Sequence, residues 1–154
     1  MSQDNAFEKG LTVLPVATYR AGETVMTAGT KSGRLLILKK GAVVILKDSI
    51  EIARVDEPRA VLGELSALSE QPHTADVRAL EDSEFYVADA ALIGKDPVML
   101  LHVARILARR IVAANGSLVE LKKQIQAGQP TSALRRMLEK VEEVLSVGGA
   151  SFET

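Results

Sequence analysis

A short stretch in the middle of the chain, GELSALSEQPHTADV over residues 63–77, has the residue types of a small anion-binding site. A one-turn helix beginning at Glu64 would present free backbone N–H groups and the positive end of its dipole, and both favour an anion. Gly63 would let the backbone approach a bound group closely. The chemistry that this pattern indicates is recognition of an anion such as a phosphate diester.

The same stretch resembles the phosphate-binding cassette of the cyclic-nucleotide-binding domain family. The resemblance is carried by the opening Gly63-Glu64-Leu65 and by Pro72, Ala75 and Val77 near the close. It implies a domain that binds cyclic AMP or cyclic GMP, with Glu64 accepting a hydrogen bond from the ribose hydroxyl. The ligand-binding positions that it implies are Gly63, Glu64, Leu65, Ser66, His73, Thr74 and Ala75.

Two cassette residues depart from the family pattern. His73 stands ten residues after Gly63, where the family has an arginine that gives a phosphate two parallel N–H donors. A histidine is mostly neutral at pH 7, and losing a charge-assisted hydrogen bond costs about 1.5–3 kcal/mol. Asp76 is expected to face the anion site, where a carboxylate about 5 Å from a phosphate would cost about 3 kcal/mol. These changes predict that cyclic-nucleotide binding is weakened or lost.

Composition excludes several other classes of protein. With 154 residues and 47% hydrophobic residues, the chain can build one domain and an appended helix, and only 3% of its residues are aromatic. The absence of cysteine excludes a disulfide framework and a cysteine nucleophile. A net charge of -1 argues against a dedicated nucleic-acid binder. No apolar run is of membrane-spanning length and no signal peptide is recognisable, so a cytoplasmic protein is expected.

The cassette lies within a series of short apolar runs that turn residues separate. The runs have the length and β-branched character of strands, and no crossover helix lies between them. They cover residues 13–19, 24–27, 35–38, 42–46, 50–55, 60–62, 76–79 and 84–88. The pattern predicts a mainly β fold of the α+β class, an eight-stranded antiparallel jelly-roll barrel with two sheets.

The family resemblance extends over the same region. Gly22, Gly29 and Gly41 stand at the family's turn glycines, whereas Arg59 stands where a turn glycine is usual. The predicted domain covers residues 11–127, with the jelly roll at 11–89 and helices at 90–127.

From Asp89 the apolar period changes to that of helices. Residues 90–94 are predicted to form a short helix. Asp96 caps a long helix with Pro97 in its first turn. After a break at Gly128-Gln129-Pro130, a shorter amphipathic helix is predicted over residues 130–147.

The long helix carries apolar residues on two sides. One stripe is Leu100, Val103, Leu107, Ile111, Leu118, Leu121 and Ile125, and a second set is Val98, Leu101, Val112 and Val119. Such a helix needs two packing partners. We expect the barrel on one side and, on the other, the same helix of a second chain, giving a homodimer through residues 97–125.

Three functions remain open on the sequence. The first is a stand-alone sensor that binds a cyclic nucleotide and signals by dimer rearrangement. The second is a regulatory module that has weakened or lost its ligand and works through an unknown protein partner. The third is a remnant of a bacterial transcription regulator that lacks its helix-turn-helix domain, and we expect no direct DNA binding because only 29 residues of the sequence follow Ile125. No catalytic constellation, metal site or cofactor is predicted, so an enzyme is the least favoured class.

Overall fold

The computed structural model describes residues 3–128, 132, 134–137 and 139. Its contacts divide the chain into two compact units, Met1–Ile106 and Leu107–Thr154. The boundary falls within the long helix α4 (Pro97–Ala127). The first unit contains all the strands that the structure describes.

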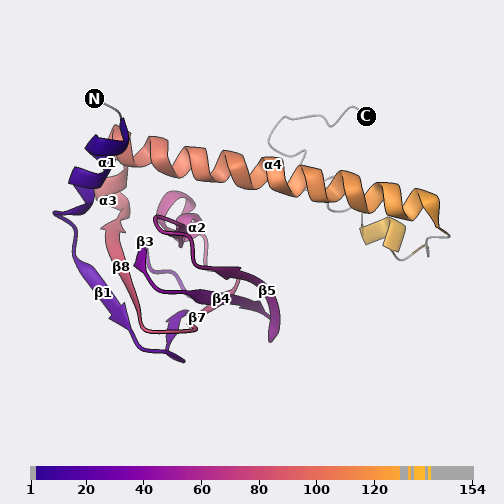
Figure 1. Ribbon diagram of the computed structural model, residues 1–154, viewed down its shortest axis with the longest axis horizontal. Helices are drawn as coiled ribbons and strands as arrows, with labels where there is room; N and C mark the ends of the chain where they lie inside the picture. Colours follow the sequence, from indigo (N-terminus) through magenta and orange to yellow (C-terminus); the bar gives the residue numbers. More distant parts are fainter. Residues whose placement is uncertain (1–2, 129–131, 133, 138, 140–154) are drawn as a thin grey trace. The chain divides into compact units, whose positions relative to one another are not determined.

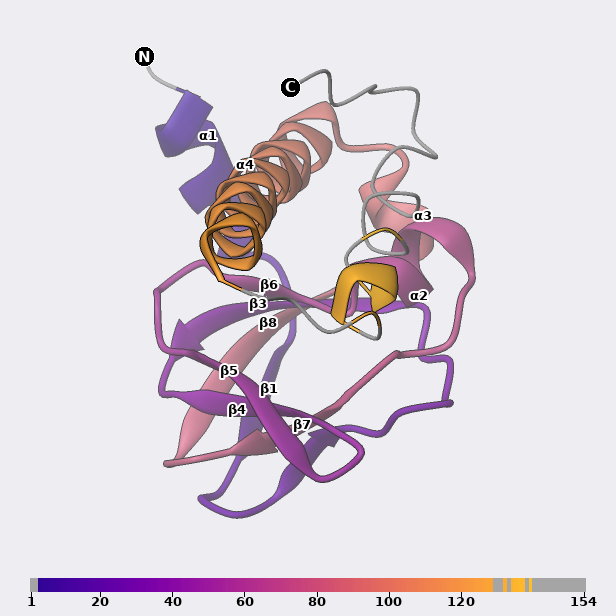
Figure 2. The ribbon, with the colours of Figure 1, turned by 90° about the vertical axis from the view of Figure 1, so that its right-hand side faces the viewer.

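Eight antiparallel strands in two four-stranded sheets build the first unit (Figures 1 and 2). The strand order is β1-β8-β3-β6 in one sheet and β2-β7-β4-β5 in the other. The strands are β1 (Val16–Tyr19), β2 (Thr24–Met26), β3 (Arg34–Lys40), β4 (Val43–Lys47), β5 (Ile50–Val55), β6 (Val61–Leu62), β7 (Asp76–Ala79) and β8 (Ser83–Asp89). The predicted eight-stranded antiparallel jelly roll is confirmed, and each predicted run overlaps one strand.

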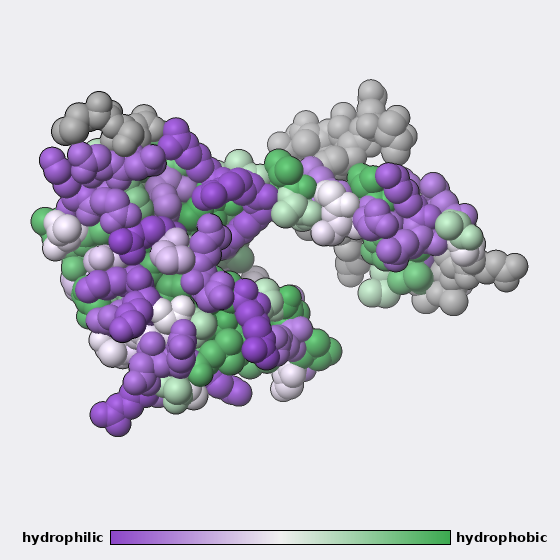
Figure 3. Space-filling model, in the orientation of Figure 1, coloured by the Kyte–Doolittle hydropathy of each residue, from purple (hydrophilic) through white to green (hydrophobic). Residues whose placement is uncertain are grey.

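The core between the sheets is mainly aliphatic, as the low aromatic content predicts. Both sheets contribute to one buried cluster, and the Tyr19 ring meets the Phe85 ring edge-on with centroids 5.9 Å apart. The cluster consists of Met26, Leu36, Leu38, Val43, Leu62, Val77 and Phe85. On the outer surface, hydrophobic residues gather at the β4–β5 end of this unit (Figure 3), where Ile50 and Ile52 of β5 are exposed.

The described helices are α1 (Gln3–Leu11), α2 (Glu64–Ser69), α3 (Ala90–Ile93) and α4. The Asp89 carboxylate caps α3 by accepting the Leu92 N–H at 2.9 Å. The Asp96 carboxylate caps α4 by accepting the N–H groups of the second and third helical residues at 3.0 and 3.2 Å. Both helices begin at the predicted residues, and the cap of α4 at Asp96 with Pro97 in the first helical position is the predicted one.

The buried face of α4 in the first unit differs from the predicted one. Met99, Val103 and Ile106 are buried, whereas Leu100 is 38% exposed. Apolar residues follow at helical spacing after Met99 and also after Leu100, so periodicity alone does not show which of the two sets is buried. Packing selects the stripe that begins at Met99.

Arg59 joins α1, β8 and α4 within the first unit. Its guanidinium donates two hydrogen bonds to the Glu8 carboxylate, at 2.7 and 2.8 Å, and lies 5.3 Å from the centre of the Tyr86 ring. Its carbonyl oxygen accepts a hydrogen bond from His102 Nε2 at 3.1 Å, and the His102 ring stacks on Phe7 at 3.8 Å. Arg59 has φ +72°, so the turn keeps the left-handed conformation that a glycine would adopt without strain.

Glu8→Gln is expected to lower the free energy of unfolding at pH 7 by up to about 1 kcal/mol. Hydrogen bonds from Arg59 hold the pKa of the Glu8 carboxyl below its ordinary value of 4.5, so the charged form stabilises the folded state. This contribution is present above about pH 4.5 and is lost as the pH falls through the lowered pKa. The effect is small because the Glu8 side chain is 48% exposed and water screens the pair.

Urea unfolding at pH 7 and pH 3 measures this contribution. The unmodified protein and the variant should differ at pH 7 and converge at pH 3. A difference of the same size at both pH values would contradict the assignment of the effect to the Glu8 charge.

In the second unit, α4 buries Leu118 and Ile125 and exposes a set of other apolar side chains. This exposed set is Ile111, Val112, Val119 and Leu121. Beyond α4, residues 132, 134–137 and 139 are helical, and the rest of the predicted 130–147 helix lies outside the described residues. Among the described helices, none has both the length and the apolar character that crossing a membrane requires.

Candidate functional site

The helix α2 begins directly after Gly63, as the cassette predicts. Gly63 has φ +83°, in the left-handed region that glycine adopts readily. A β-carbon at this position would lie 2.7 Å from the Arg34 carbonyl oxygen and 2.7 Å from the Met26 methyl group. Glycine is therefore required here both by the backbone conformation and by the close approach of β3.

The loop between β2 and β3 is fastened to the cassette by hydrogen bonds. The Gly29 N–H donates to the His73 carbonyl and the His73 N–H donates to the Thr30 carbonyl, both at 2.8 Å. Ser66 Oγ accepts the N–H of Ser32 at 3.0 Å and that of the next residue at 2.9 Å. Because Ser66 is buried, its hydroxyl holds this loop in place.

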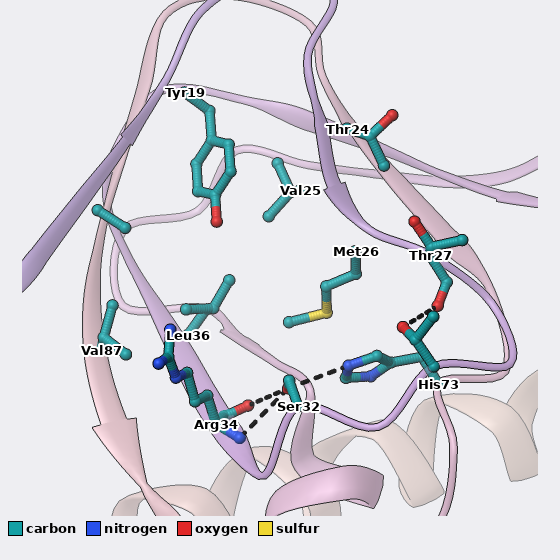
Figure 4. Close-up of a pocket in the computed structure, with 12 residues that line it drawn as sticks. Tyr19, Thr24, Val25, Met26, Thr27, Ser32, Arg34, Leu36, His73 and Val87 are labelled. Atoms are coloured by element: carbon teal, nitrogen blue, oxygen red, sulfur yellow. Dashed lines mark hydrogen bonds between the residues drawn. The ribbon is translucent and has the colours of Figure 1, made fainter.

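A cavity of about 290 Å³ lies inside the barrel beside this loop (Figure 4). One part of its wall is apolar and another part carries hydroxyl, imidazole and guanidinium groups, the mixture that small-molecule sites commonly have. The lining residues are Ala17, Tyr19, Thr24, Val25, Met26, Thr27, Thr30, Ser32, Arg34, Leu36, His73 and Val87. The cavity can therefore take a small molecule with an apolar body and an anionic group.

His73 brings the cassette into this cavity. Its side chain is buried, and Nε2 lies 3.1 Å from Ser32 Oγ (Figure 4). The same Ser32 hydroxyl accepts the backbone N–H of Arg34 at 3.2 Å. The Ser32 hydroxyl thus links the His73 imidazole to the Arg34 backbone in the cavity wall.

Comparison with known families identifies this arrangement. The model of the cyclic nucleotide-binding domain matches residues 16–94, more than half of the chain. The chain belongs to the cyclic nucleotide-binding domain family. The match covers all eight strands and the cassette, so it confirms the resemblance found in the sequence. Comparison with the curated proteins gave no match.

Several solved structures are similar to this chain in fold. The catabolite activator protein of Thermus thermophilus is similar with a TM-score of 0.64 and 22% identity, over 94% of this chain and 84% of that one. The N-terminal domain of a transcriptional regulator from Streptomyces coelicolor A3(2) gives 0.56 and 24%, over 73% and 86%. The regulatory domain of Toxoplasma gondii PKA, co-crystallised with cAMP, gives 0.55 and 20%, over 65% of this chain and 42% of that one.

The predicted cassette residues divide into one that lines the cavity and six that do not. His73 lines it, whereas Gly63 and Ser66 shape the surrounding backbone. Glu64 is partly exposed at the start of α2, and Leu65 is 42% exposed. Thr74 is exposed and Ala75 is partly exposed, and neither reaches the cavity wall. In this cyclic nucleotide-binding domain the cassette therefore contributes a single side chain to the cavity.

The structure corrects the expectation that Asp76 faces the anion site. Asp76 Oδ1 accepts the backbone N–H of Ala28 at 2.7 Å, and Asp76 is not among the described residues that line the cavity. The Asp76 carboxylate binds the β2–β3 loop because β7, which begins at Asp76, pairs with β2, and this pairing brings the loop beside it. The repulsion of about 3 kcal/mol expected between this carboxylate and a bound phosphate therefore does not apply.

Sequence reasoning missed Arg34, Ser32 and Tyr19, which line the cavity of this cyclic nucleotide-binding domain. These residues come from β1, from the start of β3 and from the loop before it, outside the cassette. The alternation of side chains along β1 and β3 was the available signal, because alternate residues of a strand point to the same face of a sheet. Arg59 does not line this cavity, and its guanidinium is bonded to Glu8.

Proposed function

We propose that this chain is a non-enzymatic regulatory module whose cyclic-nucleotide site binds its ligand weakly at pH 7. The observation that carries the proposal is His73, which occupies the wall of the cavity at the position of the family's arginine. The fold of a cyclic nucleotide-binding domain is present, and a domain of the same fold in Toxoplasma gondii PKA was crystallised with cAMP. The ligand class proposed here is therefore a cyclic purine nucleotide.

Weak binding follows from the charge at the cassette position. A neutral imidazole offers one hydrogen bond where a guanidinium would offer two with a full charge. The difference of about 1.5–3 kcal/mol corresponds to an affinity roughly 10- to 150-fold lower. Because the Asp76 carboxylate binds the Ala28 N–H, the histidine at position 73 alone accounts for the expected loss of affinity.

Two other functions are kept as candidates. Full cyclic-nucleotide sensing is favoured by Arg34, a permanent cation in the cavity wall. Regulation through a protein partner without a ligand is favoured by the hydrophobic residues exposed on β5.

Isothermal titration calorimetry with cyclic AMP and cyclic GMP at pH 7 tests the proposal. We expect saturable binding that is weaker than micromolar, together with no binding of adenosine, which shares the base and ribose but lacks the phosphate. Equal binding of adenosine and cyclic AMP would show that the anion site contributes nothing. Micromolar or tighter binding of cyclic AMP would support full sensing instead.

We also propose that the module forms a homodimer through the long helix, residues 97–125. The second unit supports this because Ile111 is 53% exposed, Val112 is 71% exposed and Val119 is 52% exposed. Covering such apolar surface is worth about 25 cal/mol per Å².

Leu107→Glu combined with Ile111→Glu is expected to convert a dimer to a monomer, because two charges would have to be buried in the interface. Sedimentation velocity at micromolar concentration measures the change, with Gln126→Glu as a control that adds a single charge at an exposed position of the same helix, outside residues 97–125. A monomeric unmodified protein would contradict the proposal.

A further inference from the structure

Arg34 is the first residue of β3, and its side chain lines the cavity (Figure 4). The Arg34 backbone N–H donates to Ser32 Oγ at 3.2 Å, and the same oxygen lies 3.1 Å from His73 Nε2. Ser32 therefore lies between the cassette position that lost its arginine and an arginine on a different element. The Arg34 guanidinium, the Ser32 hydroxyl and the His73 imidazole thus belong to the wall of one cavity.

The charge of Arg34 is not balanced inside the cavity. None of the lining residues is aspartate or glutamate, and Arg34 is the single lysine or arginine among them, as far as the structure describes the chain. Asp89 stands opposite Arg34 in the pairing of β3 with β8, but the Asp89 carboxylate caps α3. Salt bridges in the first unit join Arg54 to Glu51 and Arg59 to Glu8, and neither of these pairs includes Arg34.

An arginine at the end of a strand can simply be solvated. Three features favour a ligand here: its place in the cavity wall, the absence of a lining carboxylate and the neighbouring donors. A guanidinium stays protonated at all physiological pH values and binds a phosphate through two parallel N–H groups. It thus has the chemistry that the cassette lost when His73 replaced the arginine.

We propose that Arg34 is the fixed positive charge that binds the anionic group of the ligand in this site. The phosphate diester of a cyclic nucleotide would take two hydrogen bonds from the guanidinium, and the Ser32 hydroxyl would be a further donor while it accepts the His73 Nε2–H. This inference rests on the proposed function, because it attributes the remaining affinity of the site for a cyclic nucleotide to Arg34. The cation that binds the anion would then be the first residue of β3 and not a residue of the cassette.

Calorimetric titration with cyclic AMP at pH 7 tests the assignment on the unmodified protein, Arg34→Ala and Arg34→Lys. Arg34→Ala should weaken binding roughly 10- to 150-fold, and Arg34→Lys should fall between, because an ammonium keeps the charge but not the paired donors. The matched control is Arg78→Ala, which removes an exposed arginine of β7 that does not line the cavity. It should bind like the unmodified protein.

Two variants separate failure of this inference from failure of the proposed function. His73→Arg should bind cyclic AMP tightly. Adding Arg34→Ala to His73→Arg should reduce the affinity less than Arg34→Ala does in the unmodified protein, because the new arginine also binds the phosphate. If Arg34→Ala binds like the unmodified protein, or if binding appears only with His73→Arg, the role of Arg34 is overturned and the cyclic-nucleotide site stands. If neither the unmodified protein nor His73→Arg binds, the proposed function fails and this inference fails with it.

Discussion

His73→Arg is expected to raise the affinity for cyclic AMP at pH 7 by roughly 10- to 150-fold. The change places a permanent charge and two parallel donors on the cavity wall, where the structure has one imidazole bonded to Ser32. His73→Lys should give a smaller gain, because an ammonium is a point charge without the paired geometry. Calorimetric titration of the three proteins gives the ratio of dissociation constants directly.

A matched control for this prediction is Thr74→Arg. It adds the same side chain one residue further on, where the native residue is exposed and does not line the cavity. Its affinity should stay close to that of the unmodified protein. An equal gain from Thr74→Arg would show that charge near the site matters and that the cassette position does not. No gain from a folded His73→Arg would contradict the role given to His73.

The second large effect is expected from Gly63→Ala. The left-handed φ of +83° costs a side-chain-bearing residue about 1–2 kcal/mol, and the new methyl group would lie 2.7 Å from the Arg34 carbonyl oxygen. Because that contact is with backbone, β3 has to shift, at a further cost of roughly 1–3 kcal/mol. The shift also moves Arg34 and Ser32, so cyclic-nucleotide binding should be lost.

Gly22→Ala separates the two causes. Gly22 has a similar φ of +88°, and a β-carbon there meets no atom within 4 Å. Urea unfolding should show the strain alone for Gly22→Ala and about twice that loss or more for Gly63→Ala. Equal losses would mean that the close approach of β3 to Gly63 contributes no free energy.

The strands and the helix starts were predictable because their signals are local. Apolar runs of strand length between turn residues gave all eight strands, and Asp96 before Pro97 gave the first turn of α4. Gly63 before Glu64 likewise gave the start of α2. Each of these depends on residues within one turn or one strand of the chain.

The cavity wall was less predictable because it is assembled from distant segments. His73 was found through its distance from Gly63, but Arg34 enters the site only when β3 is placed beside the cassette. Asp76 was misplaced for a similar reason, since its partner Ala28 is 48 residues away. The bond of Arg59 to Glu8 spans 51 residues and has no local pattern to reveal it.

The measurement that tests the central claim most directly is calorimetric titration of the unmodified protein and of His73→Arg with cyclic AMP at pH 7. The unmodified protein has an imidazole in the cavity wall where His73→Arg would place a guanidinium with two parallel donors. We expect binding weaker than micromolar for the unmodified protein and binding roughly 10- to 150-fold tighter for His73→Arg. Micromolar or tighter binding by the unmodified protein that His73→Arg leaves unchanged would contradict the claim.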